Sequence, residues 1–322
     1  MLRQLPRKRD RLLYHSIITL LDVIALLPRS WNQPMARFLG NIWFRLDRRH
    51  RRITLENLTH AYKNTMIPHE IQAIARQVFT HFIMIVFRIA WGRTIDLKHF
   101  SRWFTVTGMA HYQTAARQQK GVLVLTGHVG SWELLPFFYA HTGLIHKASS
   151  VFRPLKSPAL EQFITDLRQR FGGKMFPLKK ALSGILATLE NQGSAFLLMD
   201  QSTKPHKGAI IEFFGRKTYA NKGMARLALQ TGAPVVPMFL VQKGGRYLVV
   251  IEPEIAFVDT GDEETTLQIN TQNYNRAIEK IVNQYPEQYF WLHNRWKYQP
   301  KDEKSTDRIH PRSLGLQNVN IE

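Results

Sequence analysis

From residue 105 onward, short apolar runs alternate with longer segments whose apolar residues recur at three- and four-residue steps. The runs expected to form strands are 122–126, 149–152, 195–199, 235–241 and 247–251. The segments expected to form helices are 158–171, 180–191, 223–230 and 263–285. Strands that alternate with helices form parallel sheets, because each crossover helix covers one face of the sheet. The sequence therefore predicts an α/β fold with a mostly parallel sheet covered by helices.

Residues 1–95 are expected to be helical, and their first thirty residues have a distinct composition. Five basic residues within residues 1–11 precede the largely apolar stretch 12–27. No small-x-small cleavage site follows, and sixteen residues are fewer than the ~20 that a spanning helix needs. We expect residues 1–30 to form an uncleaved, membrane-associated helix at the cytoplasmic leaflet. A buried core helix with a basic start is the alternative.

The remainder divides into two parts. We expect residues 31–299 to form one large domain. The end of the chain, 300–322, is polar and lacks periodicity, which predicts a disordered tail.

The charge balance limits the classes of partner. Lys and Arg number 44 against 24 Asp and Glu, which gives a net charge of +20. Such an excess suits an anionic membrane, an acidic carrier protein or nucleic acid. No RNP, KH, zinc-finger or helix-turn-helix pattern is present, so nucleic acid is not an expected partner. The chain has no cysteine and no H-E-x-x-H pattern, and we predict neither a metal site nor a cofactor.

One short segment, residues 127–133, carries candidate catalytic groups. It follows the buried run 122–126 directly, and the carboxyl ends of parallel strands are where catalytic loops lie. His128 titrates near neutral pH and can remove a proton from a hydroxyl. Glu133 could hold the far ring nitrogen and fix the tautomer. We predict His128 as the base and Glu133 as its orienting carboxylate. The alternative is that both are solvated loop residues.

Several blocks of the sequence resemble the late acyltransferases of lipid A biosynthesis, within the glycerolipid acyltransferase superfamily. Residues 127–133 resemble the H-x4-E block of the superfamily. The closing run 285–297 is similar to the family's Pro-Glu-Gln-aromatic-x-Trp-Leu-His-x-Arg-aromatic-Lys signature, with Asn294 where relatives often carry arginine. Further matching blocks are 52–58, 152–154, 199–201 and 231–237. The resemblance covers nearly the whole chain, residues 1–298.

The resemblance implies an enzyme at the cytoplasmic face of the bacterial inner membrane. It would move a fatty acyl chain from acyl carrier protein directly to a hydroxyl of a lipid A precursor, without a covalent acyl-enzyme. Its partners would be the carrier protein, the lipid A precursor and the anionic membrane. Two alternatives remain open: acylation of a lysophospholipid or another glycolipid, and a non-enzymatic basic membrane-binding protein.

The resemblance also selects three residues for substrate binding. Arg153 and Arg168 would hold a phosphate or carboxylate of the acceptor, which a guanidinium can bind in bidentate fashion. Asp200 follows the expected strand 195–199, where an unpaired buried carboxylate is costly. We therefore expect Asp200 to meet an arginine or a substrate hydroxyl. The alternative is a salt bridge that only shapes the loop.

Overall fold

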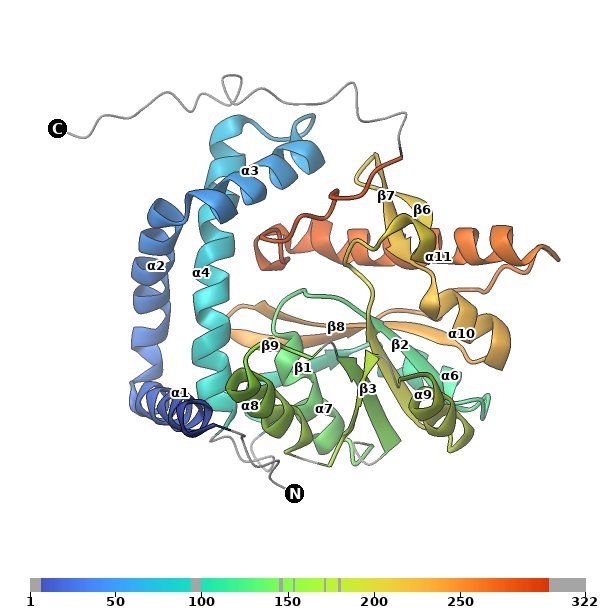
Figure 1. Ribbon diagram of the computed structural model, residues 1–322, viewed down its shortest axis with the longest axis horizontal. Helices are drawn as coiled ribbons and strands as arrows, with labels where there is room; N and C mark the ends of the chain where they lie inside the picture. Colours follow the sequence, from blue (N-terminus) through green and yellow to red (C-terminus); the bar gives the residue numbers. More distant parts are fainter. Residues whose placement is uncertain are drawn as a thin grey trace.

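A seven-stranded sheet forms the centre of the protein and confirms the predicted α/β class. The computed structural model describes residues 7–93, 100–144, 147–152, 154–170, 172–178 and 181–300. The strands are β1 Phe104–Thr107, β2 Val122–Thr126, β3 Ala148–Phe152, β4 Lys174–Pro177, β5 Ser194–Leu198, β8 Val235–Lys243 and β9 Arg246–Ile251. Their spatial order is β1-β9-β8-β2-β5-β3-β4 (Figure 1).

Strand direction changes at one place in this sheet. Strands β8, β2, β5, β3 and β4 are parallel to one another. Strand β9 returns antiparallel to β8, and β1 then pairs parallel to β9. The turn between β8 and β9 is made by Gly244 and Gly245, both with positive φ, as a two-residue hairpin turn requires. The prediction of a mostly parallel sheet is correct, with one antiparallel pair.

Strand β2 lies inside the sheet, between β8 and β5, and every one of its residues is buried. Val122 and Val124 pack into one core, while Leu123 and Leu125 pack into the core on the opposite face. Burial on both faces explains why this strand is a continuous apolar run rather than an alternating one.

Helices cover both faces of the sheet. The first core includes α6 (Met109–Ala116) and α7 (Leu135–His141). The opposite core includes α9 (Ala181–Glu190), α10 (Gly223–Thr231) and α11 (Glu263–Gln284). The sequence predicts α9, α10 and α11 to within about one residue at each end. A separate antiparallel hairpin, β6 (Gly208–Phe213) and β7 (Arg216–Asn221), was not predicted; its strand β6 contacts α11.

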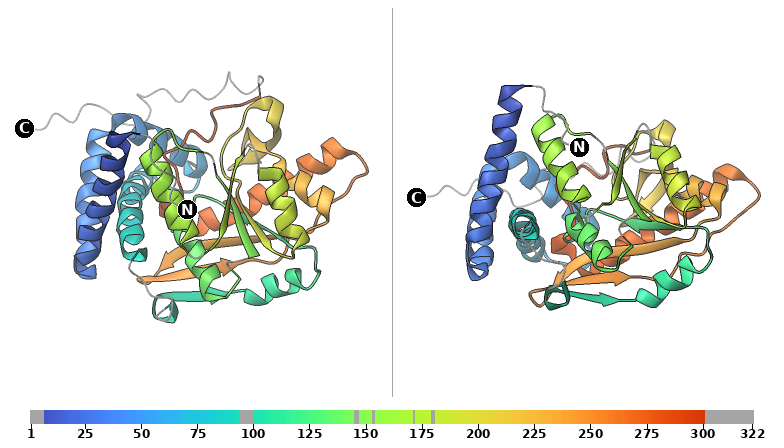
Figure 2. Two further views of the ribbon diagram at one scale, coloured as in Figure 1. Left: turned by 60° about the horizontal axis from the view of Figure 1, so that its bottom comes forward. Right: turned by 90° about the horizontal axis from the view of Figure 1, so that it is seen from below.

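Four helices form a layer beside the sheet. They are α1 Lys8–Leu26, α2 Arg29–Leu46, α3 Arg48–Tyr62 and α4 Pro68–Gly92. Helix α4 contacts each of the other three (Figure 1). Helix α1 also contacts α8 (Pro158–Gln169), which Figure 2 shows beside it. Leu27 precedes a proline and is extended, which ends α1 before Pro28.

Helix α1 combines a packed side and an exposed apolar side. Leu21 is buried in a cluster with Ala90 of α4 and Phe163 of α8. On its other side, Leu20 is 59% exposed and Leu26 is 84% exposed. The expected membrane-associated segment thus includes one buried contact and an uncovered apolar surface. Its first six residues lie outside the described part, as do residues 301–322 of the expected tail.

Apolar residues are exposed on α2 as well. Trp31, Phe38 and Leu46 are 57%, 66% and 77% exposed. Among the described helices, α4 is the one long and apolar enough to cross a membrane by length and composition, and half of that window is buried inside the protein. The division at residues 30 and 299 stays a prediction.

Candidate active site

The loop that follows β2, residues 127–131, is held by the neighbouring chain. The Ser131 N–H donates to the Leu240 carbonyl of β8 at 2.7 Å. The Gly130 N–H donates to the Gln288 carbonyl at 2.8 Å. Gly130 has φ +63°, and a Cβ there would lie 2.0 Å from the Leu240 oxygen. Only glycine can take this position, so the sequence of the loop is dictated by how closely it approaches β8.

His128 is hydrogen-bonded to Asp200 beyond the carboxyl ends of strands β2 and β5. Its Nδ1 lies 2.9 Å from Oδ1 and 3.2 Å from Oδ2 of that carboxylate. Because a carboxylate only accepts, Nδ1 carries the proton and Nε2 keeps its lone pair. Strands β2 and β5 are parallel neighbours with Thr126 opposite Leu198. The loops that follow the two strands therefore bring together residues 72 positions apart in the chain.

The environment of this pair favours its charged forms. Burial raises the pKa of the Asp200 carboxyl, but the charge and hydrogen bonds of His128 outweigh it and hold that pKa at about 2. Burial lowers the pKa of His128, but the Asp200 carboxylate outweighs burial and raises the pKa above its ordinary value. Asp200 is therefore an ionised carboxylate that makes the His128 ring more basic and stabilises the imidazolium once Nε2 has taken a proton.

Glu133 does not occupy the orienting position that its spacing predicts. The chain enters a short 3-10 helix, Trp132–Leu134, and turns the Glu133 side chain toward α8. Its carboxylate accepts two hydrogen bonds from Arg168, at 2.7 Å from Nε and 2.5 Å from Nη2. A third comes from Trp132 Nε1 at 3.1 Å. In the described part of the chain, Glu133 and His128 share no hydrogen bond. Asp200 holds the position expected for Glu133.

The Glu133–Arg168 pair is a second buried unit beside the first. Burial raises the pKa of Glu133, but the Arg168 guanidinium outweighs burial and lowers it below the ordinary value. Glu133 in turn adds to the raised pKa of His128 through its charge, without contact. Arg168 was expected to hold an anionic group of the acceptor. Two of its N–H groups donate to Glu133 instead. Arg153, the other expected clamp, lies outside the described residues.

Asp200 has the partner that its burial requires, although a different one from those expected. Its carboxylate meets an imidazole rather than an arginine or a free substrate position. Its backbone carbonyl accepts a hydrogen bond from the Tyr289 hydroxyl at 3.3 Å. Tyr289 and Trp291 of the closing block 285–297 are fully buried in the core. Through Tyr289, this block supports the backbone at Asp200.

His293 is a further residue near the site that the sequence analysis did not select. Its Nδ1 lies 2.7 Å from the Phe290 carbonyl, to which it donates. Burial lowers the pKa of His293 to about 4, so the ring is neutral at pH 7. When protonated, His293 would lower the pKa of the Asp200 carboxyl, so the two residues lie in one electrostatic environment. The sequence signal that could have selected His293 was its position in the closing block 285–297.

His128 lines a cavity of about 870 Å³. Trp132, Glu133 and Arg168 lie in the same wall, and apolar side chains from Val151, Ile164 and Leu182 cover other parts of it. A smaller apolar pocket of about 70 Å³ shares Trp132, Glu133 and Arg168 with this cavity. The arrangement provides a basic nitrogen at the wall of a large, partly apolar space. It suits proton removal from a hydroxyl on an amphipathic substrate.

The chain is similar in sequence to known acyltransferases. A lipid A biosynthesis acyltransferase from Haemophilus influenzae is 23% identical over 282 residues, 85% of this chain and 84% of the relative. A lipid A biosynthesis lauroyltransferase from Escherichia coli is 28% identical over 207 residues, 63% of this chain and 65% of the relative. A phosphatidylinositol mannoside acyltransferase from Mycolicibacterium smegmatis is 23% identical over 62% of this chain and 64% of the relative.

The family model described as bacterial lipid A biosynthesis acyltransferase matches residues 7–298. This range includes both β2 and β5, and therefore His128 and Asp200, together with the closing block. The match extends over nearly all of the described structure. The chain belongs to the bacterial lipid A biosynthesis acyltransferase family.

Proposed function

We propose that this acyltransferase moves a fatty acyl chain from acyl carrier protein to a hydroxyl of a lipid A precursor. The observation that carries the proposal is His128, whose Nε2 is the free basic nitrogen of a ring held by buried Asp200. It lies in the wall of an 870 Å³ cavity with apolar surfaces. The family supports the acceptor class.

The proposed reaction is a direct transfer. Nε2 of His128 takes the proton from the acceptor hydroxyl while its oxygen attacks the thioester carbonyl carbon. The carbon–sulfur bond then breaks, and the imidazolium returns the proton to the leaving thiolate. Asp200 stabilises the imidazolium between these steps. The chain contains no cysteine, and Ser131 does not lie in a G-x-S-x-G motif, which positions the serine nucleophile of covalent hydrolases. We therefore propose a reaction without an acyl-enzyme.

Glu133 has a different role in this proposal from the one its spacing predicted. It fixes Arg168 in the cavity wall and adds negative charge near His128. We propose that the pair orients the acceptor through the remaining guanidinium N–H groups of Arg168. Arg153 stays a proposed acceptor contact on the strength of the family resemblance alone.

The test of the acceptor is the mass of lipid A from bacteria with and without this protein. We expect a mass increase of one fatty acyl group when the protein is present, and none with the His128→Asn variant. A second candidate acceptor is another glycolipid, which the similarity to a phosphatidylinositol mannoside acyltransferase favours. Unchanged lipid A together with a mass change in another glycolipid would establish that candidate instead.

The prediction for the acyl donor concerns how the reaction rate depends on salt concentration. Acyl carrier proteins are acidic, and a chain of net charge +20 attracts them over about a Debye length, ~10 Å at 0.1 M salt. We expect kcat/KM with acyl carrier protein to fall as salt rises and to exceed that with acyl-coenzyme A carrying the same acyl chain. Initial rates across a salt series with a detergent-dispersed acceptor measure both. Equal or higher efficiency with acyl-coenzyme A would remove the carrier protein from the proposal.

We also propose that the protein binds the cytoplasmic face of the inner membrane through the exposed apolar residues of α1 and α2. These residues include Leu20, Leu26 and Phe38. Basic residues follow at the end of α2 and the start of α3, where anionic headgroups would lie.

Two adjacent leucines test this attachment. Leu20 is 59% exposed and Leu21 is 5% exposed. Leu20→Asp is expected to reduce recovery in the membrane fraction while leaving the melting temperature nearly unchanged. Leu21→Asp buries a charge in the cluster with Ala90 and Phe163, and we expect it to lower the free energy of unfolding by about 3 kcal/mol or more. Sedimentation with vesicles and thermal unfolding are the two measurements. Full membrane recovery of Leu20→Asp would contradict the attachment surface.

A further inference from the structure

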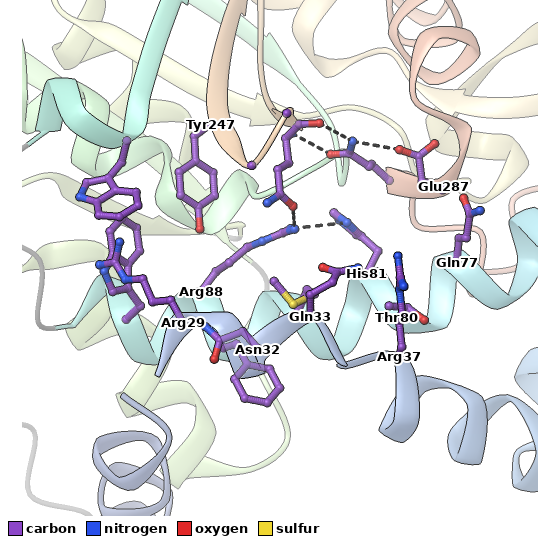
Figure 3. Close-up of a pocket in the computed structure, with 18 of the residues that line it drawn as sticks. Arg29, Asn32, Gln33, Arg37, Gln77, Thr80, His81, Arg88, Tyr247 and Glu287 are labelled. Atoms are coloured by element: carbon purple, nitrogen blue, oxygen red, sulfur yellow. Dashed lines mark hydrogen bonds between the residues drawn. The ribbon is translucent and has the colours of Figure 1, made fainter. Parts of the chain in front are cut away.

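A second large cavity lies between α2, α4 and the β8–β9 turn, and it is distinct from the His128 cavity. Its volume is about 890 Å³, and no residue is shared between the two linings. Among the described residues, its lining includes four arginines, Arg29 and Arg37 of α2 and Arg76 and Arg88 of α4, and a single glutamate, Glu287. Figure 3 labels Arg29, Arg37, Arg88 and Glu287. The cavity is therefore strongly electropositive.

Arg88 is the central residue of this cavity. It is 4% exposed and lies between Tyr247 and His81 in Figure 3. Its guanidinium donates to the Ser131 hydroxyl at 3.0 Å and to the Gln242 side-chain oxygen. Its Nε has no hydrogen-bond partner in the described chain.

Among the described residues, the hydrogen-bond acceptors of Arg88 include the side chains of Ser131, Gln242 and His81, and all three are neutral. None of the ion pairs between described residues includes Arg88 or the other three arginines of the cavity. A buried charge without a counter-charge costs several kcal/mol. Burial accordingly lowers the pKa of Arg88 below its ordinary value. An anion in the cavity would offset this cost.

His81 does not supply the missing charge balance, and it fixes the orientation of Arg88. Its Nε2 lies 3.0 Å from the Gly130 carbonyl, which can only accept, so Nε2 carries the proton. Its Nδ1 then accepts from Arg88 at 3.4 Å. Burial lowers the pKa of His81 to about 3, and the ring is neutral. Both residues thus contact the loop that carries His128.

The other three arginines, Arg29, Arg37 and Arg76, line the same cavity. Arg29 lies against the rings of Trp91 and Trp103, with its central carbon 4.2 Å and 3.7 Å from the two ring centres. Stacking covers the faces of a guanidinium and leaves its N–H edge for an acceptor in the same plane. The one carboxylate of the lining, Glu287, accepts a hydrogen bond from Gln288 at 3.0 Å.

The position of α2 indicates what kind of anion reaches this cavity. Arg29 and Arg37 line the cavity, while Trp31, Phe38 and Leu46 of the same helix are exposed apolar residues. A molecule with a phosphate and acyl chains matches both surfaces, because several guanidinium groups bind phosphate oxygens and the apolar side accepts hydrocarbon. We propose that the cavity binds the phosphate ester of a membrane-lipid headgroup, beside the catalytic loop and separate from the proposed acyl-transfer site.

The test uses a soluble lipid phosphate. Dihexanoyl phosphatidylglycerol, kept below its micelle concentration, is titrated into the detergent-solubilised protein in a calorimeter. We expect saturable binding, and weaker binding of dihexanoyl phosphatidylcholine because its headgroup has no net charge. The variant Arg37→Gln/Arg76→Gln is expected to weaken binding of phosphatidylglycerol about tenfold or more, since it removes two charged hydrogen-bond donors that can reach the phosphate. Both side chains are exposed, so the fold should persist.

Arg117→Gln is the matched control, since it removes an exposed arginine at the end of α6 that does not line the cavity. It should bind phosphatidylglycerol as the wild type does. Arg88→Gln should abolish binding while its thermal unfolding stays cooperative. Unchanged binding by Arg37→Gln/Arg76→Gln, or equal binding of the two lipids, would overturn the proposal.

Inorganic phosphate distinguishes the source of the anion. Displacement of phosphatidylglycerol only at concentrations well above those of the lipid supports a lipid headgroup. Equal affinity for inorganic phosphate would overturn the lipid assignment. Binding is measured without acyl donor or acceptor, so failure of the proposed acyl transfer would leave this result intact, and the reverse also holds.

Discussion

His128→Asn is expected to lower kcat about 100- to 10,000-fold while the protein stays folded. General-base catalysis contributes rate factors of this size. Asparagine keeps an N–H donor for the buried Asp200 carboxylate but has no basic nitrogen for the acceptor hydroxyl. The more common alanine substitution would leave Asp200 unpaired in the interior, and removing one partner of a buried pair costs ~3–5 kcal/mol. Single-turnover rates at saturating donor measure the effect.

Two controls accompany this substitution. His111→Ala changes an exposed histidine on α6 that lies outside the His128 cavity, and its rate should match the wild type. Thermal unfolding separates a loss of chemistry from a loss of structure. A His128→Asn enzyme with near-normal kcat would mean that another group removes the proton.

Asp200→Asn is expected to produce the second large effect, a fall in kcat of about 100-fold or more. Asparagine cannot stabilise the imidazolium that forms when Nε2 takes a proton, and it permits the opposite tautomer. The pH profile provides the specific signature. Asp200 raises the pKa of His128, and catalysis needs the unprotonated ring. Activity therefore falls as pH drops through that pKa, and removing the carboxylate should move this acidic limb to lower pH.

Glu133→Gln is the matched comparison, because Glu133 was the carboxylate that spacing along the chain predicted. It breaks the bidentate pair with Arg168, so we expect a loss of stability, a higher KM for the acceptor and a small shift of the acidic limb. If Glu133→Gln moves the limb strongly and Asp200→Asn does not, Glu133 is the orienting carboxylate and the assignment of Asp200 is wrong.

Much of the fold could be predicted because its central elements have strong local patterns. The run 122–126 corresponds to β2 residue for residue, and the segment 263–285 to α11 within one residue. The short edge strands β1 and β4 were not predicted, since four residues carry little periodicity. The reversed direction of β9 was also missed, although Gly244 and Gly245 are a hairpin signal.

For helix α1, the sequence pattern does not determine which apolar side chains are covered by the rest of the protein. Its apolar residues predict both a membrane-associated helix and a core helix, and the structure contains features of each. Leu21 packs into the protein, whereas Leu20 and Leu26 stay uncovered. Which leucines are covered depends on the positions of α4 and α8, which the pattern within residues 12–27 does not encode.

The sequence by itself determined that a histidine follows a buried strand, in a loop whose glycines permit a tight turn. Together with the family resemblance, it also selected Glu133, Arg168 and Asp200 as candidate site residues. Only the tertiary structure decided their pairing. Spacing along the chain determines which residues share a local element, but β2 and β5 bring His128 and Asp200 together across 72 positions. The 3-10 helix after Gly130 turns Glu133 to α8, because a buried carboxylate is most stable where a guanidinium can reach it.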